Sequence, residues 1–176
     1  MIRPLRALLL LGATSCAVAM GPPTTHADNL LVTLYDASGT RVGTVTLTMD
    51  ESGESMALVF DVYGLPPGPH AVHIHSVGLC ERPDFLSAGP HLDEGGHQHG
   101  LDNPKGPHFG DLPDLLVNED GTAHRTLRLA PAAGHIHTAM LFGSDGSAIV
   151  LHADPDDRHT DPSGKSGIRI ACGIIT

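Results

Sequence analysis

Short segments rich in Val, Leu and Ile, separated by turn residues, follow one another along most of the chain. Several of these segments alternate apolar and polar residues, which is the two-residue period of a β-strand with one buried face. Turn signals such as residues 36–40 and 143–146 separate them, and we find no convincing amphipathic helix. The pattern favours an all-β antiparallel sandwich or flattened barrel. The expected strands are 30–35, 42–49, 56–62, 71–75, 115–118, 122–129, 139–142, 149–152 and 168–174.

The first 19 residues have a different pattern and are expected to be a signal segment. Arg3 and Arg6 precede a short apolar run, and small residues follow it. The run is too short and wrongly flanked for an ordinary membrane span. Residues 17–19 form an Ala-x-Ala cleavage site, whereas residues 13–16 resemble a bacterial lipobox with an atypical alanine. We favour lipidation at Cys16 slightly, because it gives the third cysteine a role.

Residues 20–29 would then be a short tether, and residues 30–176 would form one domain. A domain of that length can bury a substantial core. The formal net charge of −10 becomes −12 once the two arginines of the signal segment are removed. Such an acidic chain has no general affinity for nucleic acid or for anionic lipid. We therefore expect an exported protein, either lipid-anchored in the cell envelope or periplasmic or secreted.

Histidines are concentrated in one part of the chain. Seven of the thirteen lie between residues 68 and 111, and an aspartate ends that stretch. A single histidine is most often an ordinary core or surface residue, but a cluster of this size favours metal binding. Imidazole suits copper and zinc, and a carboxylate oxygen completes many zinc sites.

The spacing of these histidines indicates two kinds of site. His73 and His75 alternate with Val72 and Ile74, so a strand would present both imidazoles on one face. A second group, in a Gly- and Pro-rich segment, has gaps of 8, 9 and 3 residues that fit no helix or strand. Its three nitrogens and one oxygen could form a tetrahedral zinc site and order the segment. The members of this second group are His91, His99, His108 and Asp111.

Seven ordered segments, together with these gaps, resemble the bacterial copper,zinc superoxide dismutase family. The similarity runs from about residue 30 to the C-terminus. It implies eight strands in Greek-key order with long metal-binding loops. The matching segments are PGPHAVHIH, GLCE, SAGPH, HG, NPKGPHFGDLP, IVLHADPDD and SGIRIACGII.

The resemblance implies the cofactors and their ligands. Copper would take His73, His75, His91 and His152, and zinc would take His91, His99, His108 and Asp111. His91 would bridge the two metals as imidazolate. Asp156 matches a carboxylate that hydrogen-bonds ligands of both metals. The alternative is that Asp156 is a solvated loop acid without a role in the site.

The resemblance also implies the reaction, which is dismutation of superoxide to oxygen and hydrogen peroxide at a redox-cycling copper. His91 would carry a proton, and zinc would be structural. Arg169 would attract and orient the anion beside the copper. The alternative is that Arg169 is an exposed charge on a strand without a role in the reaction. Such an enzyme would protect the cell envelope from extracellular superoxide.

Two cysteines, Cys80 and Cys172, remain in the expected domain. An even number of cysteines in an exported protein indicates a disulfide, and the family pairs these two positions. Two free buried thiols are the alternative.

Some features depart from the family or stay outside its site. Asp93 and Glu94 replace the family's Asn-Pro, and the short segment 153–167 carries four acids against Arg158 and Lys165. Both put the efficiency of anion guidance in doubt. His70 matches a structural position. The remaining histidines are expected to stay outside the metal site: His26, His97, His124, His135, His137 and His159.

Two other function classes remain open. One is a non-catalytic copper- and zinc-binding envelope protein with a dismutase-like fold, against which the intact ligand sets and Arg169 argue. The other is a surface lipoprotein that serves adhesion. The oligomeric state is left open.

Overall fold

The computed structural model describes residues 29–49, 55–93, 95–129 and 138–176. The expected signal segment with Cys16, together with His26, Glu94, His135 and His137, lies outside these residues. Within the described ranges, no helix is long and apolar enough to cross a membrane.

Nine short strands form the described part of the fold, and all of their pairings are antiparallel. Seven strands form one sheet in the order β5-β8-β9-β1-β2-β3-β7, and β4 pairs with β6. The predicted all-β antiparallel architecture is therefore confirmed. The strands are β1 (Leu30–Asp36), β2 (Arg41–Met49), β3 (Met56–Val62), β4 (Gly68–His70), β5 (Val72–His75), β6 (Leu115–Val117), β7 (Ala123–Leu129), β8 (Ser147–His152) and β9 (Arg169–Ile175).

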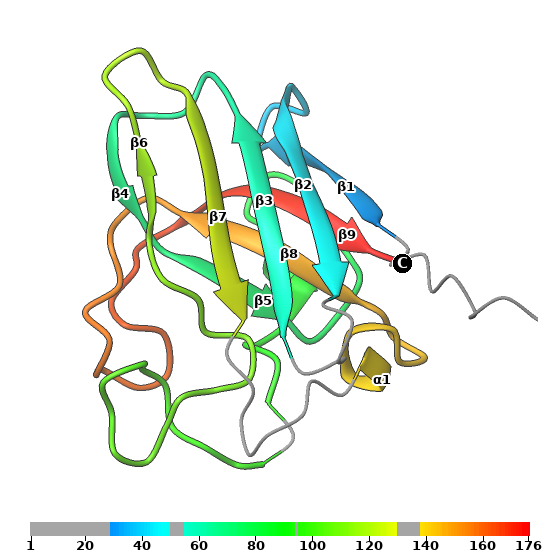
Figure 1. Cartoon of the computed structure of the whole chain (residues 1–176), viewed down its shortest axis with the longest axis vertical. Helices are drawn as coiled ribbons and strands as arrows, with labels where there is room; N and C mark the ends of the chain where they lie inside the picture. The colour runs from blue at the N-terminus through cyan, green and yellow to red at the C-terminus, as the bar shows by residue number, and fades with distance from the viewer. Residues whose placement is uncertain (1–28, 50–54, 94, 130–137) are drawn as a thin grey trace, which may run out of the picture.

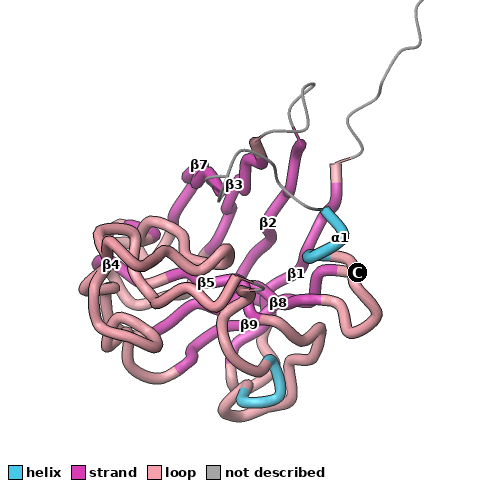
Figure 2. Tube along the Cα trace, turned by 90° about the horizontal axis from the view of Figure 1, so that it is seen from below, coloured by secondary structure: helices cyan, strands magenta, loops and turns pink. Residues whose placement is uncertain are grey.

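The large sheet curls into two layers. In Figure 1, β7, β3, β2 and β1 form the front layer, and β9, β8 and β5 cross behind them. Figure 2 shows that most loops gather on the side of β4, β5, β8 and β9. The long connections 76–114 and 153–168, which follow β5 and β8, therefore meet on the same side of the molecule.

Alternation explains how the strands share one core. On β3, Met56, Leu58, Phe60 and Val62 point inward and are buried, and the residues between them are more exposed. Burying a side chain as large as Phe60 contributes roughly 2–3 kcal/mol before entropy is counted. The strand pattern of the sequence thus becomes one hydrophobic layer between the two halves of the sheet.

Strand β8 differs because both of its faces are buried. Ile149 and Leu151 join the main core. Ala148 and Val150 pack on the other side, in a small cluster with Phe85, Ala88 and the two cysteines 80 and 172. The loops on this side therefore rest on a second apolar layer, which fixes their position.

The strand expected at 71–75 is present as β5, but a short strand that was not expected, β4, precedes it. β4 pairs with β6, whereas β5 pairs with β8. Ala71 lies between them, and its backbone bonds to Asp154 and His152 instead. This change of partner makes β4 a separate strand.

The segment 139–142 was expected to be a strand, but it lies in and after the helical turn α1 (Thr138–Leu141). Leu141 is fully buried in the core, and its carbonyl oxygen accepts a hydrogen bond from Ser147 Oγ at 2.8 Å. A four-residue apolar run has no period that distinguishes a strand from a helical turn. A 3₁₀ turn at Leu86–Ala88 is the other helical element of the described residues.

Candidate metal centre

Strand β5 places its two histidines as the alternation predicted. Val72 and Ile74 belong to the main core, and His73 and His75 point to the opposite face, where both are buried. The neighbouring strand β8 ends in His152, which is also buried. These two neighbouring strands therefore supply three imidazoles from a rigid part of the sheet.

The loop after β5 returns to the free edge of this strand. Isolated antiparallel bridges join His75 to His91 and His73 to Asp111. The Ile74 N–H donates to Gly110 O at 2.8 Å, and a Cβ at Gly110 would collide with Ile74 O. Only glycine allows this close approach. The sequence GD at 110–111 therefore serves to bring the aspartate against β5.

Four imidazoles form a first cluster in which the ligand atoms lie within 4.8 Å of one another: His73, His75, His91 and His152. In each of these residues one buried ring nitrogen has no hydrogen-bond partner. The four nitrogens are His73 Nδ1, His75 Nε2, His91 Nε2 and His152 Nε2. A buried polar atom without a partner costs about 1–3 kcal/mol, so four at one point indicate a missing common partner.

The second nitrogen of each ring explains which lone pair is free. His73 Nε2 lies 2.9 Å from Asp156 Oδ2, and His75 Nδ1 lies 2.8 Å from Gly89 O. His152 Nδ1 lies 3.1 Å from Ser166 Oγ, whose own hydroxyl donates to Ser163 O. These nitrogens therefore carry the proton, and the opposite nitrogens present lone pairs to the cluster.

Burial keeps three rings of the first cluster, those of His75, His91 and His152, neutral. Desolvation lowers the pKa of His75 to about 2, that of His91 to about 4 and that of His152 to about 3. The neighbouring imidazoles act in the same direction. Neutral imidazole is the form that binds a transition metal, so the donor set fits copper or another metal that prefers nitrogen ligands.

A second cluster surrounds Asp111. Its Oδ1 lies 2.9 Å from His91 Nδ1, 3.0 Å from His99 Nδ1 and 3.5 Å from His108 Nδ1. Its Oδ2 accepts the backbone N–H of Gly100 and of His108. Three nitrogens and one oxygen thus converge, which is a donor set that zinc accepts.

A purely geometric grouping of ligand atoms around Asp111 includes His73 with His91 and His99. We assign His73 to the first cluster, because its Nε2 bonds Asp156 and its Nδ1 faces the other three imidazoles. His108 is the better member of the second cluster, since its Nδ1 lies 3.4 Å from His91 Nδ1. His91 thus belongs to both clusters, one through each ring nitrogen.

Charge in the second cluster favours a cation. Burial alone would raise the pKa of Asp111, but hydrogen bonds from His91, His99 and Gly100 hold it well below its usual range. Burial would likewise lower the pKa of His99, but Asp111 and Asp156 raise it to about 9. The carboxylates therefore attract a positive charge to this point, as a bound zinc ion would supply.

Asp156 joins the two clusters from outside. Its Oδ2 accepts from His73 Nε2 and its Oδ1 from His99 Nε2, both at 2.9 Å. Its own backbone N–H donates to Asp114 Oδ1 at 3.1 Å. This is the placement that the resemblance implies for Asp156. Asp114 and Ser166 were not predicted, since an acid before a short strand and a serine in a Gly-rich loop carry no signal of their own.

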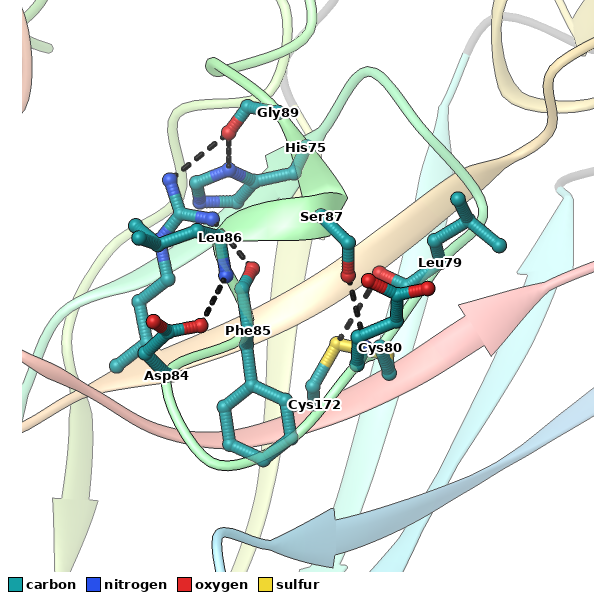
Figure 3. The surroundings of a disulfide bond; sticks show 11 residues. His75, Leu79, Cys80, Asp84, Phe85, Leu86, Ser87, Gly89 and Cys172 are labelled. Atoms are coloured by element: carbon teal, nitrogen blue, oxygen red, sulfur yellow. Dashed lines mark hydrogen bonds between the residues drawn. A yellow bond between two sulfur atoms is a disulfide. The ribbon is translucent and has the colours of Figure 1, made fainter.

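Arg169 lies at the start of β9, half-buried beside the first cluster. Its guanidinium donates to Phe85 O at 2.6 Å and to Gly89 O at 2.8 Å. Gly89 O also accepts from His75 Nδ1, as Figure 3 shows. One carbonyl group therefore fixes both the cation and a histidine of the first cluster.

The disulfide between Cys80 and Cys172 is confirmed. Their Cα atoms are 5.8 Å apart, and the bond links positions 92 residues apart in the chain. Figure 3 shows it close to Phe85 and Ser87, in the loop that continues to Gly89. The bond therefore ties the loop that leads into His91 to strand β9.

The described histidines outside the predicted ligand sets lie outside both clusters. The two ring nitrogens of His70 lie 2.8 Å from His152 O and Pro66 O, which suits a structural role. His97 is exposed, and its Nδ1 lies 2.7 Å from Asp93 Oδ1. Asp93, which stands where the family has Asn, therefore closes a local turn with His97.

Comparisons with known proteins agree with this geometry. The family model described as copper/zinc superoxide dismutase (SODC) matches residues 41–175. A curated protein of Caulobacter vibrioides, "Superoxide dismutase [Cu-Zn]", is 41% identical over 140 residues, which cover 78% of this chain and 79% of that protein. "Superoxide dismutase [Cu-Zn] 1" of Aquifex aeolicus is 37% identical and covers 86% of each chain.

A similar solved structure is the SOD-like protein from Bacillus subtilis. It has a TM-score of 0.75 and 35% identity, over 83% of this chain and 97% of that one. The family model alone spans most of the chain. The chain therefore belongs to the copper/zinc superoxide dismutase family.

Proposed function

We propose that the two clusters hold one copper ion and one zinc ion, joined through the ring of His91. As a member of this family, the chain is an enzyme that dismutates superoxide with copper and zinc as cofactors. Copper would be held by His73 Nδ1, His75 Nε2, His91 Nε2 and His152 Nε2. Zinc would be held by the Nδ1 atoms of His91, His99 and His108 and by Asp111 Oδ1.

One observation carries this proposal: the four unpartnered ring nitrogens of the first cluster are buried and converge, while the other nitrogen of His91 faces Asp111. A ring with one nitrogen in each cluster can contact two metals at once. A structural zinc site alone would not need the first cluster.

The reaction converts two superoxide anions and two protons into one oxygen and one hydrogen peroxide. Copper, when bound, would supply the one-electron redox chemistry that both halves of this reaction need and that zinc lacks. The side chains of the protein guide the anion to the site and deliver a proton to it. The Arg169 guanidinium, fixed by two carbonyl oxygens, attracts and orients the anion.

His91 is suited to hold a proton at Nε2, the atom that faces the first cluster. Asp111 fixes the other side of its ring, so that the proton is delivered from a defined position. Asp156 holds the rings of His73 and His99 in place from outside. These groups orient the site before the substrate arrives, which is the arrangement that lowers reorganisation cost.

The experiment is to load purified protein with both metals and measure its dismutation rate. We expect activity in the parent, at least about a 100-fold loss in His75→Ala because a copper ligand is removed, and unchanged activity in His97→Ala, the matched exposed-histidine control. A fully loaded parent without activity would contradict the proposal. Stoichiometric binding of both metals without activity would indicate the alternative, a non-catalytic metal-binding protein.

We also propose that the enzyme acts outside the cytoplasm, where it would protect the cell envelope, and is lipid-anchored through Cys16. The charge and apolar pattern of residues 1–19 and the disulfide support export, because disulfides persist in oxidising compartments. Cell fractionation and mass spectrometry of the mature N-terminus test this. A Cys16→Ser variant should move from the membrane fraction to the soluble fraction, and an unprocessed cytoplasmic chain would contradict export.

A further inference from the structure

One carboxylate in the β8–β9 loop faces two of the residues proposed to hold zinc. Asp161 Oδ1 accepts the backbone N–H of His99 at 2.7 Å. The same oxygen lies 3.9 Å from His108 Nε2. The Nδ1 atoms of both rings point the other way, towards Asp111. Asp161 therefore lies behind these histidines, on the side away from the proposed zinc.

A metal-bound histidine usually donates its second ring N–H to an oxygen, which fixes the tautomer and raises the basicity of the ligating nitrogen. His73 and His99 have Asp156 for this purpose, His75 has Gly89 O, and His152 has Ser166. For His108, the carboxylate that faces Nε2 among the described residues is Asp161.

Backbone packing holds Asp161 in this position, although its side chain is 49% exposed. The loop segment 158–164 lies directly against residues 99–103. Asp102 N–H donates to Arg158 O at 3.2 Å, and a Cβ at Gly100 would collide with that same oxygen. A Cβ at Gly164 would collide with Asp156 Oδ1 and with His99 Nε2. Side chains larger than glycine would push the two segments apart.

We propose that Asp161 is a positioning residue for the zinc half of the site. It anchors the His99 backbone and, through its negative charge, holds His108 with the N–H at Nε2 and the lone pair at Nδ1. This rests on the proposed zinc set of His91, His99, His108 and Asp111. If Asp161 has this role, zinc binding depends on the β8–β9 loop, which ends at Arg169.

Two variants separate the contacts. Asp161→Asn keeps an oxygen for the His99 N–H but removes the charge behind His108, and Asp161→Ala removes both. Asp157→Asn is the control, because Asp157 contacts Thr160, His159 and Lys165 in the same loop and no proposed ligand. Zinc affinity is measured by chelator competition on copper-loaded protein, and the site is also probed by the visible spectrum of Co(II) in place of zinc.

We expect zinc affinity to fall about 10-fold in Asp161→Asn and about 100-fold in Asp161→Ala, with a changed Co(II) spectrum in both. Copper affinity should stay within about two-fold, and Asp157→Asn should match the parent. Parent-like zinc affinity in both variants would overturn the inference. Parent-like affinity in Asp161→Asn alone would overturn the role of the charge on His108.

The thermal midpoint of the metal-free variants serves as the control for folding. If Asp161→Ala lowers this thermal midpoint and weakens copper binding as much as zinc binding, the effect on the protein is general and the inference is overturned. A parent that binds no zinc would instead overturn the proposed function itself, so the two failures are distinguishable.

Discussion

At the scale of single residues, the site depends on which nitrogen of each ring carries a proton. Ser166 illustrates this. Its hydroxyl hydrogen is committed to Ser163 O, so its oxygen can only accept, and His152 must be protonated at Nδ1. A buried serine without any metal contact thereby directs the Nε2 lone pair of His152 into the first cluster.

We expect Ser166→Ala to weaken copper binding about 10-fold, because His152 loses the acceptor that fixes its tautomer. Ser163→Ala is the control, since it keeps the carbonyl group and alters the same loop. Copper affinity by competition with a chromophoric chelator measures both. Equal affinities in the two variants would show that His152 does not need this partner.

The shared ring of His91 leads to a spectroscopic prediction. In the parent, removal of zinc should perturb the electron paramagnetic resonance spectrum of oxidised copper, because the Nδ1 side of His91 loses its second metal. In His91→Ala the spectrum should no longer depend on zinc, although both metals keep their other three ligands. A parent spectrum that is indifferent to zinc would mean that His91 does not join the sites.

The sequence predicts these residues unequally. His73 and His75 follow from strand alternation, and the histidines of the loop stand out by their number and suggest zinc by their donor set. Only the family resemblance assigned His91 to both metals and added His152 to the copper ligands. Asp114, Ser166 and Asp161 could not be predicted. Their contacts are made with residues 42, 14 and 62 positions away, and they depend on how the loops fold together.

At the scale of elements, the site depends on loops that two rigid strands hold in place. The strands were predictable because their apolar period matches the core they bury. The helical turn at α1 was not, because four apolar residues suit either structure. The loops rest on the outer face of β8 and are closed by the disulfide, which lies between the segment before His91 and strand β9.

Replacing both cysteines, as Cys80→Ala with Cys172→Ala, should lower the free energy of unfolding of the metal-free protein by about 2–4 kcal/mol. The unfolded chain is no longer cross-linked, and the loop that carries Phe85 and Gly89 is held less firmly against Arg169. Urea unfolding measures this. Reduced parent protein is the control and should show the same loss, and an unchanged midpoint in both would refute the role of the bond.

At the scale of the whole molecule, an acidic protein must admit an anion. Twenty acidic residues oppose ten basic ones, so the average field repels superoxide. The guanidinium of Arg169 offsets this locally, because it is fixed at the first cluster. Field attraction of this kind acts over about 10 Å at 0.1 M salt and weakens as salt is added.

Arg169→Ala should therefore reduce the dismutation rate by about 10-fold or more and flatten its dependence on ionic strength. Arg169→Lys keeps the charge and should retain most of the salt dependence. Arg128→Ala, an exposed charge-matched control on β7 in the opposite layer, should behave like the parent. Stopped-flow rates at several salt concentrations decide between these outcomes, and an unaltered slope in Arg169→Ala would exclude this cation from the approach path.

The full burial of β5 on both faces limits how this sequence can change in evolution or by engineering. Its four residues alternate between core and metal site. One inserted or deleted residue would exchange the two sets, placing imidazoles in hydrocarbon and aliphatic chains at the metals. Length variation must therefore be confined to segments outside β5, such as the turn at 36–40.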